Sequence, residues 1–141
     1  MKNGEKRVKH LEMIQAVITR MASSSALMKN YALGTFTMGA GLSRFLQAPE
    51  IMLASAGLVV SFWFLDSKYL QQEKWFRDIY NAERKKPDTE PVNFAITPTL
   101  EIIKKTNLCY GLKSWATRWL YVPMLVICCL LWLSFHSKFS S

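Results

Sequence analysis

Charged and apolar residues occur in separate blocks along this chain, and three long stretches carry no charge at all. These stretches are residues 30–43, 51–65 and 119–135. In a soluble domain the apolar residues recur at helix or strand periods, so that each element keeps a polar face. Residues 51–65 have only Ser55 and Ser61 as polar side chains and are therefore apolar on every face of a helix. The pattern predicts an all-α membrane protein. The alternative is that the first two stretches are core helices of a soluble domain.

Each charge-free stretch is shorter than an ordinary membrane span. At ~1.5 Å per residue they extend roughly 21 to 26 Å, whereas the hydrocarbon core is ~30 Å thick and takes about 20 residues. Flanking Lys and Arg side chains can lengthen a span by reaching to the lipid headgroups. We therefore predict three short transmembrane helices, at about residues 29–46, 50–66 and 115–136. The first two form a hairpin over residues 29–66.

The distribution of basic residues predicts the orientation of these spans. The chain has 18 Lys+Arg against 10 Asp+Glu, a formal net charge of +8. Six of the basic residues precede the first charge-free stretch and ten lie between the second and third stretches, whereas Arg44 and Lys138 are the only others. By the positive-inside rule, the N-terminus and the middle segment are cytoplasmic. The C-terminal tail, residues 137–141, is then external.

Residues 1–28 are expected to form a basic leader and an amphipathic helix. Apolar side chains recur every three or four positions between Leu11 and Met21, and polar side chains fill the positions between them. Two interpretations stay open. The helix lies on the anionic inner leaflet, or it packs against a neighbouring helix.

The second span is expected to continue into the cytoplasm as one stalk helix from about Pro49 to about Lys85. No Gly or Pro interrupts the sequence between Asp66 and Lys85. A stripe at helical spacing follows one face of this stalk, and we predict that it binds a partner, either the N-terminal helix or the stalk of a second subunit. The stripe consists of Tyr69, Gln72, Phe76, Ile79 and Tyr80. A loop and a short helix complete the cytoplasmic segment, residues 67–114.

Small residues four positions apart mark packing faces on the first two spans. In lipid, such spacing lets helix backbones approach closely, which apolar surface alone does not drive. Three short spans bury little surface within one chain, so we predict a homo-oligomer with the first span inside. It is a pore if polar side chains line the centre and a static scaffold if they close against the second span. The pairs are Thr35 with Gly39, Thr37 with Gly41, and Gly57 with Ser61.

The sequence carries few signs of catalysis. Its two histidines, His10 and His136, fall on opposite sides of the predicted membrane. It has no Gly-rich phosphate loop, no Cys-x-x-Cys and no His-Glu-x-x-His motif. We therefore expect no enzyme activity, no catalytic residue, no metal and no cofactor. A membrane enzyme is the least favoured hypothesis.

Four charged residues are expected at the inner membrane interface. Asp66 could serve as a proton relay, but we favour a side chain that snorkels to the headgroups. The basic middle segment also raises the possibility of nucleic-acid binding. Its acidic residues are interspersed and topology already explains its charge, so we expect no direct nucleic-acid contact. The interface residues are Asp66, Lys68, Lys113 and Arg118.

Three strings resemble a family of small bacterial inner-membrane proteins. They are KHLEMIQAVITRM (Lys9–Met21), FWFLDSKYLQQE (Phe62–Glu73) and WLYVP (Trp119–Pro123). The resemblance implies a multi-pass protein of the bacterial inner membrane. In organisation such proteins resemble the small membrane components of anti-phage systems, some of which form oligomers that perturb the membrane or recruit a cytosolic partner. The alternative is a passive anchor that tethers a soluble enzyme or nucleic-acid-binding protein.

Overall fold

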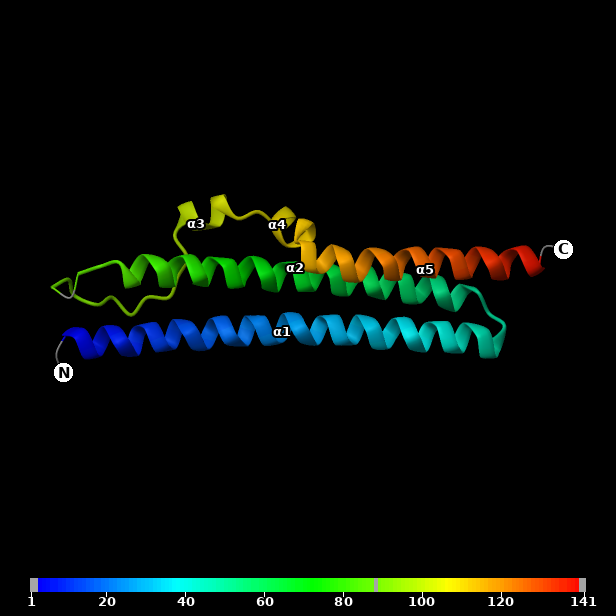
Figure 1. Ribbon diagram of the computed structural model, residues 1–141, viewed down its shortest axis with the longest axis horizontal. Coiled ribbons are helices and arrows are strands. Elements are labelled where there is room, and N and C mark those ends of the chain that lie inside the picture. The colour runs from blue at the N-terminus through cyan, green and yellow to red at the C-terminus, as the bar shows by residue number, and fades with distance from the viewer. Residues whose placement is uncertain (1–2, 88, 140–141) are drawn as a thin grey trace.

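The fold is entirely helical over the part of the chain that the structure describes. The computed structural model describes residues 3–87 and 89–139, with side chains to residue 137. Five helices follow one another along these residues (Figure 1). They are α1 (Asn3–Leu46), α2 (Glu50–Arg84), α3 (Leu100–Lys105), α4 (Leu108–Lys113) and α5 (Trp115–Phe139).

α1 and α2 form a long antiparallel hairpin (Figure 1). α1 has 44 residues, which corresponds to ~66 Å. The turn begins at Gln47, whose φ of 53° places it in the left-handed region. The Ala48 N–H donates to the Ser43 carbonyl at 3.2 Å. This six-to-one bond closes the end of α1 as a Schellman motif does, and Pro49 then leads directly into the first turn of α2.

The residues of α1 that face α2 recur every three, four or seven positions, as in a coiled-coil seam. Most are small or polar rather than leucine. At Gly39 the helices approach so closely that a Cβ atom would overlap the Ser55 side chain. The buried set is Arg7, His10, Ile14, Ile18, Ser25, Ala32, Gly39 and Ser43.

The helix boundaries agree in part with the sequence predictions. The continuous stalk helix is confirmed, because α2 runs without a break from Glu50 to Arg84. The amphipathic helix expected within residues 1–28 and the span expected at 29–46 are joined in one helix. No proline separates them, and packing against α2, closest at Gly39, supports the helix through its glycines.

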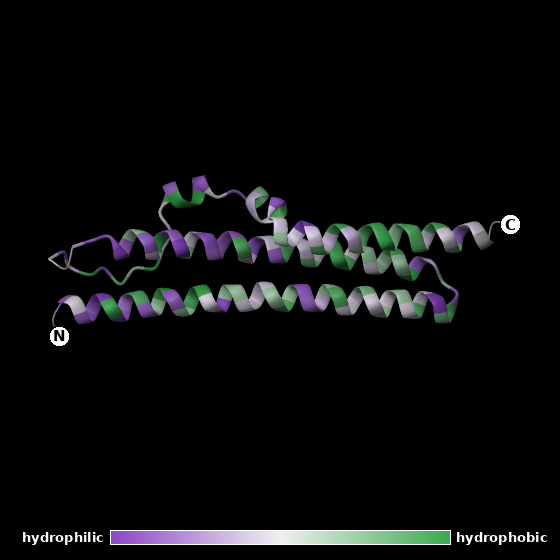
Figure 2. Cartoon of the chain, in the orientation of Figure 1, coloured by the Kyte–Doolittle hydropathy of each residue, from purple (hydrophilic) through white to green (hydrophobic). Residues whose placement is uncertain are grey.

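α5 packs on the N-terminal part of α2, and its C-terminal end lies beside the α1–α2 turn (Figure 1). The core between the three helices consists of Ala32, Val59, Tyr121 and Met124. Hydropathy divides the molecule along its length: apolar residues concentrate towards the α1–α2 turn and α5, and polar residues towards the N-terminus (Figure 2).

Two described helices, α2 and α5, are long and apolar enough to cross a membrane. The expected second and third spans lie in these helices. The expected first span lies in the C-terminal part of α1, where three glycines and several hydroxyl side chains lower the hydropathy. A membrane crossing by α1 therefore stays a prediction.

A long connection covers the polar end of the hairpin. The Arg7 guanidinium donates to the carbonyl oxygens of Lys86 at 2.6 Å and Glu90 at 3.3 Å. The His10 ring meets Phe94 edge-on at a centroid distance of 5.5 Å. These contacts tie the connection to α1 before the chain turns into α3.

Candidate functional site

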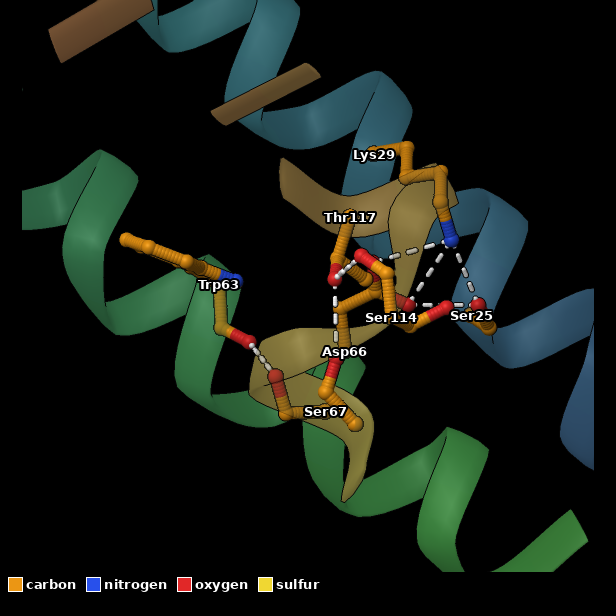
Figure 3. Close-up of polar contacts among 8 residues, drawn as sticks. Ser25, Lys29, Trp63, Asp66, Ser67, Ser114 and Thr117 are labelled. Carbon is orange, nitrogen blue, oxygen red and sulfur yellow. Dashed lines mark hydrogen bonds and ion pairs between the residues drawn. The ribbon is translucent and has the colours of Figure 1, made fainter. Parts of the chain in front are cut away.

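A buried carboxylate lies where the polar and apolar parts of the molecule meet. Asp66, on α2, is fully buried. The Lys29 ammonium group on α1 lies 2.9 Å from each of its carboxylate oxygens. The Ser25 hydroxyl, one turn earlier on α1, donates to the same carboxylate at 2.5 Å and accepts from Lys29 at 2.7 Å (Figure 3). We call Ser25, Lys29 and Asp66 the polar junction.

The two charged residues of the polar junction differ in their exposure to solvent. The Lys29 side chain is 26% exposed, whereas the Asp66 side chain is completely buried. Removing a carboxylate from water costs several kcal/mol, which an ammonium partner and a hydroxyl donor must offset. Loss of Lys29 would leave the carboxylate buried without its counter-charge. The junction therefore holds α1 and α2 in one register.

Aromatic side chains surround the apolar side of the junction. Tyr121 of α5 is fully buried, and its ring stacks on Trp63 with centroids 5.8 Å apart and planes 8° from parallel. The Tyr121 hydroxyl lies within electrostatic reach of Asp66. Among the described residues, neither this hydroxyl nor the Trp63 indole N–H has a hydrogen-bond partner of standard geometry. A small polar region thus extends from the ion pair into the apolar core.

The elbow between α4 and α5 is the third component of the site. Gly111 of α4 packs against the backbone of Ser67, so closely that a Cβ atom would overlap it. The buried Thr117 hydroxyl donates to the carbonyl oxygens of Gly111 at 2.8 Å and Ser114 at 2.9 Å (Figure 3). These contacts fix the start of α5 beside Asp66.

The preferred interpretation of Asp66 does not agree with its burial. We expected its side chain to snorkel to the headgroups, but it points between the helices towards Lys29. The three basic residues grouped with it, Lys68, Lys113 and Arg118, are exposed. Asp66 is buried because the nearby Lys29 ammonium group lowers the free-energy cost of keeping its carboxylate between the helices.

Ser25 and Lys29 were not predicted as partners of Asp66, although the sequence contains a signal for Lys29. In an antiparallel hairpin, residues equally far from the turn lie opposite each other. Lys29 and Asp66 are equally distant from the centre of the turn, between Gln47 and Ala48. Two opposite charges at equal depth in the hairpin predict an ion pair.

The small residues singled out in the sequence fall into two groups. Gly39 is buried against α2 and Thr35 is half-buried. The other four are exposed, and the Thr37 and Ser61 hydroxyls donate to carbonyls of their own helices. Their role in an oligomer stays a prediction. The exposed group is Thr37, Gly41, Gly57 and Ser61.

The predicted partner-binding stripe is half-buried within the chain. Tyr80 lines a groove of about 360 Å³ together with Gln15 and Ile18 of α1. The neighbouring face carries the ion pairs Lys74–Asp78 at 2.9 Å and Arg77–Glu73 at 2.6 Å. The N-terminal helix therefore lies across a groove from Tyr80, and binding of a separate partner to the stripe stays a prediction. Its members are Tyr69, Gln72, Phe76, Ile79 and Tyr80.

The histidines and acidic residues do not converge on a common site. His10 lies in the polar half against Phe94, and His136 lies on α5 with its ring 5.3 Å from that of Trp132. Within the described part of the chain, no group of three or more His, Cys, Asp or Glu residues could hold a metal ion. The chemistry available at the polar junction is that of a hydrogen-bonded ion pair.

No protein-family model matches this chain, and no curated protein or solved structure matches it either. The family resemblance of Lys9–Met21, Phe62–Glu73 and Trp119–Pro123 therefore stays a prediction made from the sequence. The geometry of the helices, the polar junction and the elbow is the basis for assigning a function.

Proposed function

We propose that this chain is a non-enzymatic, multi-pass membrane protein that holds a cytosolic partner at the bilayer. One observation carries the proposal: the outward surface of the apolar part is covered with large apolar side chains. A soluble monomer rarely exposes a continuous patch of this kind, whereas lipid solvates it without cost. These exposed side chains include Met38, Leu42, Leu53, Leu58, Val60, Phe64, Val126, Ile127, Leu130 and Leu133.

Three helices share the proposed membrane part. The C-terminal half of α1, the N-terminal half of α2, and α5 lie side by side, with the α1–α2 turn and the C-terminal end of α5 at the same end of the molecule (Figure 1). Three crossings with the polar half inside agree with the excess of Lys and Arg in that half. We propose the bacterial inner membrane as the location, with the N-terminus in and the C-terminus out.

Anchoring is the activity that the packing of a single chain supports best. Ala32, Val59, Tyr121 and Met124 fill the space between the three helices, and the ion pair closes its polar end. A permeation path would therefore have to form between copies of the chain. The exposed small residues Thr37 and Gly41 would then face that path.

Thiol labelling tests the topology with the chain's own cysteines. Cys109 on α4 is exposed and should be cytoplasmic. In a Cys128→Ala/Cys129→Ala background, a membrane-impermeant maleimide should label Cys109 only after the cells are permeabilised. In a cysteine-free background, Ala48→Cys at the turn should be labelled in intact cells. Labelling of both sites in intact cells, or release of the protein by an alkaline carbonate wash, would contradict the proposal.

The proposed homo-oligomer can be tested through the glycines on the outer surface. Nothing lies within 4 Å of a Cβ atom built on Gly41 or Gly57, so bulky residues fit the monomer at both. Gly41→Leu and Gly57→Leu should shift the detergent-solubilised protein from oligomer to monomer in light scattering. Cys129→Leu, at an exposed position of α5 outside the small-residue pairs, is the control. A wild-type monomer would exclude the assembly.

Anti-phage defence is the biological context that the sequence resemblance suggests. Expression of the chain with its neighbouring genes should then lower the plating efficiency of phage. A membrane-perturbing component should also collapse the membrane potential during infection. A passive anchor should leave the potential intact but lose its soluble partner from the membrane fraction when Phe76 and Tyr80 are changed to polar residues.

A further inference from the structure

Two grooves meet at the elbow between α4 and α5. Their volumes are about 420 and 410 Å³, and both are lined by Lys113, Arg118 and Val122. Trp115 and Trp119 line the first groove, and Val60 and Phe64 line the second. Of the residues that the structure describes, none that lines either groove is acidic. Lys113 and Arg118 therefore border two grooves whose other lining residues are largely apolar.

The cations are available for a ligand. Lys113 and Arg118 are both exposed, and neither forms an ion pair within the described part of the chain. The buried carboxylate beside the elbow, Asp66, is already paired with Lys29. A third cation, Lys68, lies over the Phe64 ring at 5.8 Å, at the edge of the second groove. The local field is thus positive without internal compensation.

Trp115 and Trp119 indicate the level in a bilayer at which the two grooves would lie. Trp115 and Trp119 are 76% and 68% exposed, with ring centroids 5.9 Å apart. Exposed tryptophans of membrane proteins concentrate at headgroup level. Val60, Phe64 and Val122 would then lie at the depth of the acyl chains, directly beside the cations.

Close contacts hold the backbone of the elbow, so the positions from which the two cationic side chains extend are set before any ligand arrives. Gly111 is locked against the Ser67 backbone, and Thr117 bonds across the elbow to Gly111 and Ser114. Lys113 precedes the elbow and Arg118 follows it. A phosphate held between a guanidinium fork and an ammonium group gains charge-assisted hydrogen bonds from both.

We propose that the second groove binds one anionic phospholipid. The phosphodiester lies between Lys113 and Arg118, and the acyl chains follow the apolar walls formed by Val60, Phe64 and Val122. Positive-inside topology accounts for cations in the middle segment, but it does not account for their placement around an apolar groove. Basic pockets beside membrane helices on the cytoplasmic side bind such headgroups. The site rests on the proposed membrane function, since lipid reaches it only if this part is embedded.

Native mass spectrometry of the purified full chain tests the site. Detergent-solubilised wild type is titrated with phosphatidylglycerol and, separately, with phosphatidylcholine. We expect the first bound lipid to favour phosphatidylglycerol by about tenfold, which corresponds to ~1.4 kcal/mol. Lys113→Gln/Arg118→Gln should remove that preference. Lys104→Gln/Lys105→Gln, which removes the same charge from α3, is the matched control and should retain it.

Two further measurements distinguish a phospholipid from free phosphate and control for misfolding of the variants. Inorganic phosphate in large excess should displace little phosphatidylglycerol, because it cannot occupy the apolar walls. Arg118→Lys keeps the charge but loses the fork and should give an intermediate preference. Equal binding of the two lipids by wild type, full displacement by inorganic phosphate, or equal loss in the control would overturn the site.

An alkaline carbonate wash separates this inference from the proposed function. Wild type that stays in the membrane but shows no lipid preference contradicts only the lipid site. Wild type that is washed from the membrane contradicts the membrane function itself, and with it the lipid site.

Discussion

The carboxylate of Asp66 on α2 lies 2.9 Å from the ammonium group of Lys29 on α1, at the boundary between the polar and apolar parts of the hairpin. Ser25 completes the arrangement from one turn away on α1. An ionisable residue in a membrane helix is rare and is a functional candidate by default. Here its geometry assigns it a definite mechanical role, which is to set the register between two helices.

Removing only one partner of this pair should be far worse than removing both. Lys29→Met leaves a buried carboxylate without its counter-charge and should lower the free energy of unfolding by about 3–5 kcal/mol. Lys29→Met/Asp66→Leu replaces the pair with apolar groups and should lie within about 1 kcal/mol of wild type. Denaturant titration in detergent, followed by circular dichroism, measures both variants.

The control for that experiment is Lys74→Met. Lys74 pairs with Asp78 on a partly exposed face of α2, and such a pair contributes only about 0.5 kcal/mol. A Lys29→Met variant as stable as Lys74→Met would show that the junction does not hold the hairpin.

A methyl group at position 111 should loosen the elbow. Gly111→Ala forces α4 away from the Ser67 backbone, and we expect a loss of about 1–3 kcal/mol from overpacking. The exposed Cys109 thiol, on the same short helix, should then react faster with maleimide. Gly34→Ala is the control, because nothing lies within 4 Å of a Cβ atom there, and it should stabilise α1 by up to about 1 kcal/mol.

The hairpin turn should gain stability from glycine. Gln47 occupies the left-handed region with φ 53°, which costs a residue with a Cβ atom roughly 1 kcal/mol. Gln47→Gly should therefore raise the free energy of unfolding by up to about 1 kcal/mol, less the added flexibility of the unfolded chain. Gln47→Val should lower it, since a β-branched residue adopts positive φ least readily. The opposite order of the two variants would contradict this account.

Arg7 should control the mobility of the connection after α2. Its guanidinium donates to the carbonyl oxygens of Lys86 and Glu90, so Arg7→Gln should release these carbonyls. Limited proteolysis within residues 85–99 should accelerate several-fold, whereas cleavage elsewhere should not change. Arg20→Gln removes an exposed charge from the same helix and should leave the cleavage rate unchanged.

Local sequence information was sufficient for α2 and α3, but it predicted neither the continuity of α1 nor the separate short helix α4. The absence of Gly and Pro between Asp66 and Lys85 predicts an uninterrupted stalk, and α2 has nearly the expected bounds. A short helix was likewise expected after the loop, and α3 forms there. These features depend on backbone propensity, which acts over a few residues.

The environment of Asp66 could not be obtained from local pattern. A carboxylate at the end of an apolar stretch is equally compatible with snorkelling and with burial, and the choice depends on which residue lies opposite. Lys29 and Ser25 come from another helix, and Gly111 and Thr117 from a third segment that reaches the site only after a long connection. Their convergence required the assembled structure.

The sequence alone therefore determined the helical character of the chain, the continuity of its second helix, and the division into polar and apolar blocks, because composition and periodicity act locally. The tertiary structure decided which charges are neutralised and which stay available. Asp66 is buried against Lys29, whereas Lys113 and Arg118 line an apolar groove and have no ion-pair partner among the described residues. The physical reason is that the cost of a charge depends on its surroundings, and helices distant in sequence supply those surroundings.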